Sequence, residues 1–378
     1  MNKKLLSLTA LAACVAFTMT ACSDDDEEEV HIASVDPSAD NIENWGNYMT
    51  IVSKLLANDA TTLYSDWATE YNNTGRSYAT YFKSSALTAQ EAAQQIIDGC
   101  KEIANEVGES KIGEPISLWA DGKKEKAVLA VESWYSWHSR DDYSNNIRSI
   151  RNSYYGTTDG TVATSSLSSL VKAANADLDT KVVDAINDAI DKIQAIPQPF
   201  RNNLGSDEAV AAQAACKDLC DLFEGDLKKC VASLTDDEAL QAAVGQYVDN
   251  VVVPTYADLA AKNGALYLAV QAFAKAPSTA TFAACGVAWL AARQPWETSE
   301  AFLYGPVADK GLDPNMDSWP LDQDGIENIL SSADYSQLNW DGEFDEESET
   351  IASAQSLRGF HTLEFLIFKD GKARTYSE

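Results

Sequence analysis

Histidine is scarce in this sequence, with three residues in 378, at positions 31, 138 and 361. None of them belongs to the H-E-x-x-H pair with which many zinc peptidases bind their metal. Such a peptidase needs three protein ligands, an open position for water and a nearby general base. The histidine content therefore disfavours that class of enzyme, but it leaves room for a site that combines one imidazole with several oxygen ligands.

Cysteine is also limited, since only five of the seven residues fall in the part of the chain that we expect to fold. These five are Cys100, Cys216, Cys220, Cys230 and Cys285. An odd number cannot pair completely and no C-x-x-C occurs, so neither a disulfide scaffold nor a zinc knuckle is expected. Cys216 and Cys220, four residues apart on an expected helix, are interpreted as small buried apolar residues.

The alternating pattern of β-strands is nearly absent, whereas helical spacing of apolar residues recurs along the chain. Helices are expected from about 45 to 67 and in the stretches 88–108, 124–152, 165–195, 207–231, 236–273, 279–303 and 348–368. The sequence therefore predicts an all-α fold of two four-helix-bundle-like domains packed side by side. Their expected bounds are 41–203 and 236–378, with a non-helical acidic insert at 305–349. A connecting helix is expected at 204–235, where it links the two bundles or completes one of them.

The N-terminus has the features of an export signal, with two lysines, an apolar run and small residues before Cys22. The residues from Met19 to Cys22 resemble a lipobox, in which the peptidase cuts before a cysteine that then carries lipid. We expect a lipoprotein signal peptide over 1–21, a lipidated Cys22 and an acidic tether over 22–40. A retained transmembrane anchor is the alternative, although the apolar run is short for it.

The acidic run SDDDEEE after Cys22 bears on location. It resembles the stretch that directs some lipoproteins of Gram-negative bacteria to the cell surface. The expected location is therefore the outer membrane, held in its lipid through Cys22, with the protein exposed on the cell surface or on the periplasmic face.

Negative charge dominates the composition, because 58 acidic residues face 28 lysines and arginines and give a net charge of −30. Such a surface repels nucleic acid and anionic lipid. It does not repel cations. We therefore expect a metal ion or another small charged ligand as partner, and no nucleic acid.

The stretch LRGFHTLEFLIF at 357–368 places polar residues in an apolar run. On a helix that begins at Ser348, His361 and Glu364 lie one turn apart on the same face. Apolar neighbours leave that helix no solvent-facing side, so both side chains should be buried. A buried carboxylate needs a cation, a donor or a proton. We predict that His361 and Glu364 are metal ligands; the alternative is a structural pair, with Glu364 bound to Arg358 or another basic group.

Gly359, next to this motif, is expected to cost about 1 kcal/mol in a helix relative to alanine. Its missing side chain could let another backbone or a ligand come within reach of His361. Glycine at this position is therefore interpreted as a packing requirement of the site.

Two further polar stripes could face the motif. One, in ARQPWETSEAFLYGP, places Glu297 and Glu300 on the same helix face as Arg293, with Trp296 turned away. The other consists of Glu132, Ser136, Ser139, Asp142 and Asn146. Each stripe alone is more typical of a solvated helix face, so both gain significance only if the fold directs them at His361.

The segment GFHTLEF at 359–365 matches the GxHxxE motif of the imelysin-like proteins. Four other segments resemble the same family: WETSEAFLYGP at 296–306, LDPNMDSWPLDQDGIENIL at 312–330, YVDNVVVPTYADL at 247–259 and the stretch 132–156. In most of the family the part that resembles 247–368 precedes the part that resembles 45–200, whereas here it follows. The chain is therefore identified as a circularly permuted member.

This resemblance implies two related helical bundles with a site at their interface and a role in bacterial iron uptake. The implied site residues are Gly359, His361, Glu364, Glu297, Glu300, Glu132, Ser136, Ser139, Asp142 and Asn146. The implied ligand is a metal ion, with iron as the first candidate, and the implied partner is a transport component of iron uptake.

Two alternatives remain open. The family was first grouped with metallopeptidases, so an HxxE metallopeptidase is one. Haem is the other, with His361 as its axial ligand, although the sequence lacks a cysteine attachment pattern for haem and a helical interface leaves little room. A binding protein fits the residues better, since an imidazole with carboxylates and hydroxyls forms an oxygen-rich set of ligands.

Overall fold

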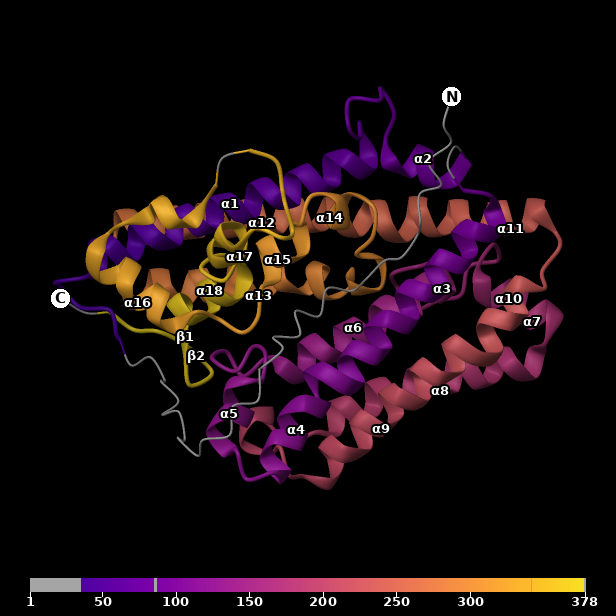
Figure 1. Cartoon of the computed structure of the whole chain (residues 1–378), viewed down its shortest axis with the longest axis horizontal. Coiled ribbons are helices and arrows are strands. Elements are labelled where there is room, and N and C mark those ends of the chain that lie inside the picture. The colour runs from indigo at the N-terminus through magenta and orange to yellow at the C-terminus, as the bar shows by residue number, and fades with distance from the viewer. Residues whose placement is uncertain (1–34, 85–86, 341, 377–378) are drawn as a thin grey trace.

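The structure, a computed structural model, describes residues 35–84, 87–340 and 342–376 (Figure 1). Its regular elements are helices apart from one short hairpin of β1 (Phe368–Lys369) and β2 (Lys372–Ala373), so the all-α class is confirmed. The expected signal peptide, Cys22 and most of the tether lie outside the described residues. Within them, no helix combines the length and the apolar character needed to cross a membrane.

One group of helices is arranged around three long neighbours, α1 (Ile42–Ala68), α12 (Val253–Lys275) and α13 (Thr279–Glu297), which cross the upper half of Figure 1. Helix α12 packs on both α1 and α13, and α18 (Gly359–Ile367) also contacts both. Shorter C-terminal helices complete this group: α14 (Pro306–Asp309), α15 (Leu312–Asp317), α16 (Gln323–Ser332) and α17 (Glu349–Gln355).

The second group runs diagonally through the lower half of Figure 1. Its long helices are α3 (Ala89–Glu106), α6 (Ser139–Tyr155), α8 (Ala176–Ala195) and α9 (Asp207–Leu222). Helix α8 packs on α6 and α9, and α3 packs on the same two helices. The smaller helices beside them are α4 (Gly113–Ala120), α5 (Lys124–Leu129), α7 (Leu167–Ala174), α10 (Lys228–Ala232) and α11 (Asp237–Tyr247). Helix α2 (Tyr78–Ser84) contacts both α1 and α3 and so lies where the two groups meet.

These groups differ from the contiguous domains expected at 41–203 and 236–378. Helix α1 precedes the second group in the sequence, yet it packs on α12 and α18. It does so because its apolar face, which includes the fully buried Trp45 and Tyr48, needs a partner surface, and chain order does not decide which surface that is. Helix α9 packs on α8 and α3, so its segment completes the second group, which is one of the two roles expected for 204–235.

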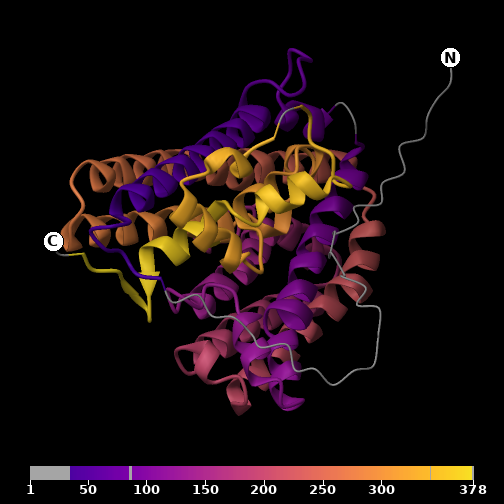
Figure 2. The same ribbon diagram turned by 60° about the vertical axis from the view of Figure 1, so that its left-hand side comes forward.

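The two ends of the described chain lie at the same edge of the molecule in both views (Figures 1 and 2). Arg374 Nη1 donates to the carbonyl of Val35 at 3.2 Å and to Asp36 Oδ1 at 2.7 Å. Neighbouring ends are what a circular permutation requires. The permuted order itself stays a prediction from the sequence.

Three π-helical turns lie within the longer helical runs: η1 (Val107–Lys111), η3 (Phe223–Leu227) and η4 (Val248–Val252). The first joins α3 to α4 and brings Lys111 into the interior, where the residue is 4% exposed. Turns of this kind are rare and often occur near functional sites.

The helix expected over 348–368 is interrupted, because α17 ends at Gln355 and α18 begins at Gly359. Gly359 has a φ of +90°, and a Cβ there would lie 2.5 Å from the carbonyl oxygen of Met316. The glycine therefore starts a new helix and lets another backbone approach, as the packing interpretation expected. That backbone leads directly into Asp317.

Two further expectations about helices were wrong. The helix predicted over 124–152 is broken between α5 and α6, where Ser133 and Trp137 adopt positive φ values of 52° and 62°. The insert at 305–349, predicted to be non-helical, contains α14, α15 and α16. Both differences matter for function, because the loop at 130–138 and the end of α15 supply groups to the site.

Candidate functional site

His361 and Glu364 are fully buried on α18 and lie between the two helix groups. The imidazole Nδ1 is 3.1 Å from Glu364 Oε2, and Nε2 is 3.1 Å from Asp317 Oδ1. The other oxygen of Glu364 accepts hydrogen bonds from the backbone N (2.8 Å) and Oγ (2.7 Å) of Ser136. The indole of Trp319 stands edge-on to the imidazole, with ring centroids 4.7 Å apart. Ser136 lies in the loop before α6, so its backbone N–H is not used in a helical hydrogen bond and can donate to Glu364.

Arg293 on α13 holds the carboxylates next to this pair. Its guanidinium, which is fully buried, lies 2.6 Å from Glu297 Oε1 and 3.4 Å from Asp142 Oδ2, and it also binds Asp317. Asp142 accepts a second hydrogen bond, at 2.5 Å, from Ser133 Oγ. One arginine therefore connects acids from α6, α13 and α15.

Additional donors fix these acids in place. Asn146 Nδ2 donates to Glu297 Oε2 at 2.5 Å, and Trp296 Nε1 donates to Asp317 Oδ2 at 2.7 Å. Both oxygens of Asp317 are thus engaged. Glu297 Oε1 is close to the guanidinium, but it accepts no hydrogen bond of good geometry.

A second buried cation, Lys111, lies beyond Glu300. Its ammonium is 3.1 Å from Glu132 Oε2, 3.5 Å from Glu106 Oε1 and 4.0 Å from Glu300 Oε1. Ser139 Oγ donates to the carbonyl of Glu132 at 2.5 Å and so positions this part of the loop.

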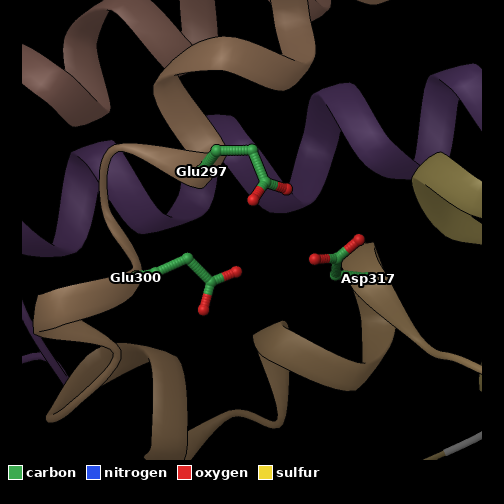
Figure 3. A group of neighbouring side chains, drawn as sticks. All are labelled: Glu297, Glu300 and Asp317. Atoms are coloured by element: carbon green, nitrogen blue, oxygen red, sulfur yellow. The ribbon is translucent and has the colours of Figure 1, made fainter. Parts of the chain in front are cut away.

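Three carboxylates meet next to the two cations, since Arg293 binds two of them and Lys111 lies 4.0 Å from the third. Glu297 ends α13, Glu300 begins the 3-10 turn η5 (Glu300–Phe302), and Asp317 ends α15. One oxygen from each lies within 4.8 Å of the others, and Figure 3 shows the three groups directed toward a common space. Carboxylate oxygens are ligands for hard cations. We refer to Glu297, Glu300 and Asp317 as the carboxylate trio.

Burial changes the protonation of these acids. Desolvation outweighs the attraction of Arg293 and raises the pKa of Glu297 to about 8. Burial likewise raises the pKa of Glu300 well above its usual range. More acids than cations are therefore enclosed here, and protons make up part of the difference.

Asp317 and His361 form the exception, as a charged pair. Burial acts to raise the pKa of Asp317, but Arg293 and His361 hold it well below its usual range. Burial and Arg293 act to lower the pKa of His361, yet the charge and hydrogen bond of Asp317 and the hydrogen bond of Glu364 raise it to about 9. At neutral pH the imidazole therefore carries a positive charge.

The ten residues predicted from the sequence gather in this one region. Eight of them contribute side chains to the charge network: His361, Glu364, Glu297, Glu300, Glu132, Ser136, Asp142 and Asn146. Gly359 contributes space, and Ser139 binds a backbone carbonyl instead of a site side chain. Their role in ligand binding stays a prediction.

Sequence reasoning missed two charged residues of the site. Asp317 lay in the insert that was expected to be non-helical, and Lys111 followed an expected helix without a distinguishing pattern. Trp296, expected to point away, donates to Asp317. Arg358, the suggested partner of Glu364, instead lies 3.0 Å from an oxygen of Asp59.

The sequence model of the imelysin family, named as a peptidase family, matches residues 24–224 and 252–378, and the chain therefore belongs to this family. A crystal structure of an imelysin peptidase from Bacteroides ovatus is similar, with a TM-score of 0.89 and 51% sequence identity, and the match covers 91% of this chain and 99% of that chain. Iron-regulated protein A of Synechococcus elongatus is 35% identical over 122 residues, which is 32% of this chain. That match spans only 30% of the length of the curated relative.

Proposed function

We propose that this protein binds a metal cation at the carboxylate trio and serves bacterial iron uptake as a cell-envelope binding component. The observation that carries the proposal is the convergence of three buried carboxylates to within 4.8 Å. Enclosed acids outnumber enclosed cations around them, so a bound cation would replace protons and restore charge balance. The name of the relative from Synechococcus elongatus, Iron-regulated protein A, links that relative to iron and makes iron the first candidate here.

The donor set fits such an ion. Oxygen ligands lie about 2.0 to 2.6 Å from hard divalent cations, so ligands on opposite sides of one ion are about 4 to 5 Å apart. The spacing within the trio is compatible with these values. The described cysteines are free thiols elsewhere in the fold, so the trio itself offers oxygen alone.

His361 and Glu364 have a supporting role in this proposal. Their hydrogen bonds join Asp317 on one side to Ser136 on the other and so fix one wall of the site. A protonated imidazole cannot bind a metal. Direct ligation by this pair, predicted from the sequence, therefore requires that His361 lose its proton when the cation arrives.

Haem fits this geometry less well. An axial histidine must offer one ring nitrogen to the iron. Both nitrogens of His361 are 3.1 Å from carboxylate oxygens, and Trp319 covers the ring edge-on. Haem entry would require that these contacts break.

The location and the partner belong to the same proposal. A lipid on Cys22 would hold the protein on the outer membrane, with the acidic segment 22–40 as tether, and a transport component of iron uptake would receive the cargo. Fatty-acid labelling tests the anchor: the label should be present in the natural protein and absent in Cys22→Ser. Equal labelling of both proteins would refute lipidation at Cys22.

Metal content tests the site. We expect the purified protein to bind about one iron or manganese ion per chain, and Glu297→Gln combined with Glu300→Gln to reduce the affinity at least tenfold. Asp188→Asn, which removes a half-exposed acid on α8, should leave binding unchanged. Equal binding by the natural protein and the double variant would refute the proposal.

A parallel assay addresses the peptidase alternative, which the name of the Bacteroides ovatus relative favours. The protein is incubated with an unfolded protein substrate, with and without a chelator. We expect no cleavage. Cleavage that is lost both with the chelator and in His361→Ala would favour the enzyme over the binding protein.

A further inference from the structure

Lys111 is an unusual residue of the buried cluster. Lysine is almost never fully buried unless it is paired, yet this one is 4% exposed, in the π-helical turn η1. Its ammonium does not dock on a single acid. It lies among three carboxylates at 3.1, 3.5 and 4.0 Å, all of them longer than the roughly 2.7 to 2.9 Å of a strong charged hydrogen bond.

The three acids around Lys111 differ in exposure. The side chain of Glu106 is 44% exposed, that of Glu132 is 13% exposed and that of Glu300 is 4% exposed. The three acids therefore form a line from the solvent to the interior of the protein. The innermost, Glu300, is also a member of the carboxylate trio.

The chemistry of lysine suits a position that another cation can take over. Arginine offers a rigid fork of donors, whereas lysine is a compact point charge on a flexible stem of four carbons. Arg293 uses its fork to hold three acids at once. Lys111 donates a hydrogen bond to Glu132 Oε2 at 3.1 Å but lies 4.0 Å from Glu300, so its ammonium can move away from Glu300 while it keeps that bond.

We propose that the ammonium of Lys111 occupies an outer cation position, on the solvent side of the carboxylate trio, and competes with the incoming cation for Glu300. This inference rests on the proposed function. Glu106, Glu132 and Glu300 form the acid-lined approach, and the lysine balances their charge until a metal cation arrives. The side chain thereby sets both the affinity and the number of ions that the site accepts.

Removal of the ammonium tests this role, because the acids left behind should then recruit a cation from solution. Mn²⁺ binding is measured by electron paramagnetic resonance on the full chain. Lys111→Met should bind Mn²⁺ at least tenfold more tightly than the natural protein, or bind a second ion. Lys111→Arg keeps the charge and should not reproduce the gain.

A nearby lysine provides the matched control. Lys217 on α9 pairs with Glu109 of the same π-helical turn at 2.5 Å, but its side chain is 49% exposed. Lys217→Met removes one positive charge close to the site without opening the outer position. It should bind Mn²⁺ as the natural protein does. A gain equal to that of Lys111→Met would overturn the inference, because general electrostatics would then explain both.

Lys111→Met leaves buried acids without their counter-ion and can prevent folding. Lys111→Met combined with Glu132→Gln removes one of those acids and should fold without added metal, as circular dichroism can show. Since the competitor for Glu300 is gone, this double variant should also bind Mn²⁺ more tightly than the natural protein. Equal or weaker binding by the folded lysine variants would overturn the inference.

The two proposals fail in different ways. If the natural protein binds Mn²⁺ and the lysine variants show no gain, only the role of Lys111 is refuted. If neither the natural protein nor any lysine variant binds Mn²⁺, both are refuted.

Discussion

The buried charge cluster has two ends that are built from the same kinds of residue in different ways. At the inner end, Arg293 lies within bonding distance of Asp142, Glu297 and Asp317, and none of these side chains is more than 4% exposed. At the outer end, the ammonium of Lys111 lies 3.1 to 4.0 Å from three acids, and the side chain of one of them, Glu106, is 44% exposed. The inner end is fixed and the outer end is adjustable.

This difference suggests where a guest ion can be accommodated. A cation that entered the inner end would have to displace a guanidinium from three partners, which is costly for buried charges. The carboxylate trio lies between the ends, with Glu297 and Asp317 held by Arg293 and Glu300 close to Lys111. We infer that the inner end positions two of the ligands, while the outer end regulates access to the third.

The largest effect is expected at the inner end. Arg293→Met leaves several buried carboxylates without their cation, and loss of one partner of a buried ion pair costs about 3 to 5 kcal/mol. The free energy of unfolding, measured with denaturant at neutral pH, should fall by about that amount. Arg293→Lys keeps the charge but lacks the fork and should lose less. A stable Arg293→Met would show that the inner end is not a scaffold.

The stability of the folded protein should depend on pH through two buried groups at the inner end. Glu297 and His361 have raised pKa values, about 8 and about 9, so both bind protons more tightly in the folded protein than in the unfolded chain. Their contributions to stability are complete below their ordinary values, 4.5 and 6.5, and are lost as the pH rises through about 8 and 9. Metal-free protein should therefore melt at a lower temperature near pH 9 than near pH 6.

The size of this loss can be estimated. One unit of pKa shift corresponds to about 1.4 kcal/mol, so the two groups together should contribute on the order of several kcal/mol. Glu297→Gln and His361→Gln should each flatten the melting profile between pH 6 and 9. Asp317, whose pKa is depressed, acts in the opposite direction, and its contribution is lost only as the pH falls below 3.8. A melting temperature that rises toward pH 9 would contradict this account.

The sequence predicted the helices well where one apolar face is continuous. Helix α1 shows its apolar residues at steps of three and four, and it was expected close to its observed bounds of Ile42–Ala68. The grouping of helices was harder, since α1 packs on α12 across about two hundred intervening residues. Periodicity shows that a face must be buried, but it does not show against which partner.

The site was predictable as far as it follows helical spacing or the family motif. His361 and Glu364 are one turn apart on α18, and Asp142 and Asn146 are one turn apart on α6. Asp317 was not predictable in this way, because its place beside His361 depends on the close approach that Gly359 allows to the backbone of Met316. Contacts of this kind arise from tertiary packing.

Lys111 shows a second limit of prediction from the sequence. Its burial depends on a π-helical turn, which shifts the faces of the helix relative to the normal period. A helical projection that assumes 3.6 residues per turn therefore misplaces every residue beyond that turn. Glu132 and Ser136 are a separate case, because they reach the site from the irregular loop between α5 and α6, where no helical period applies.

The smallest effect is expected for Glu106→Gln, at the outer rim. The side chain is 44% exposed and lies 3.5 Å from Lys111, so water can replace most of what the carboxylate provides. The free energy of unfolding should change by less than about 0.5 kcal/mol, as for most surface substitutions. Denaturant unfolding of this variant beside Arg293→Met therefore measures the contrast between the two ends directly. A loss that approached the value for Arg293→Met would mean that the outer end is as rigidly coupled as the inner one, and Lys111 could not then give way to an incoming ion.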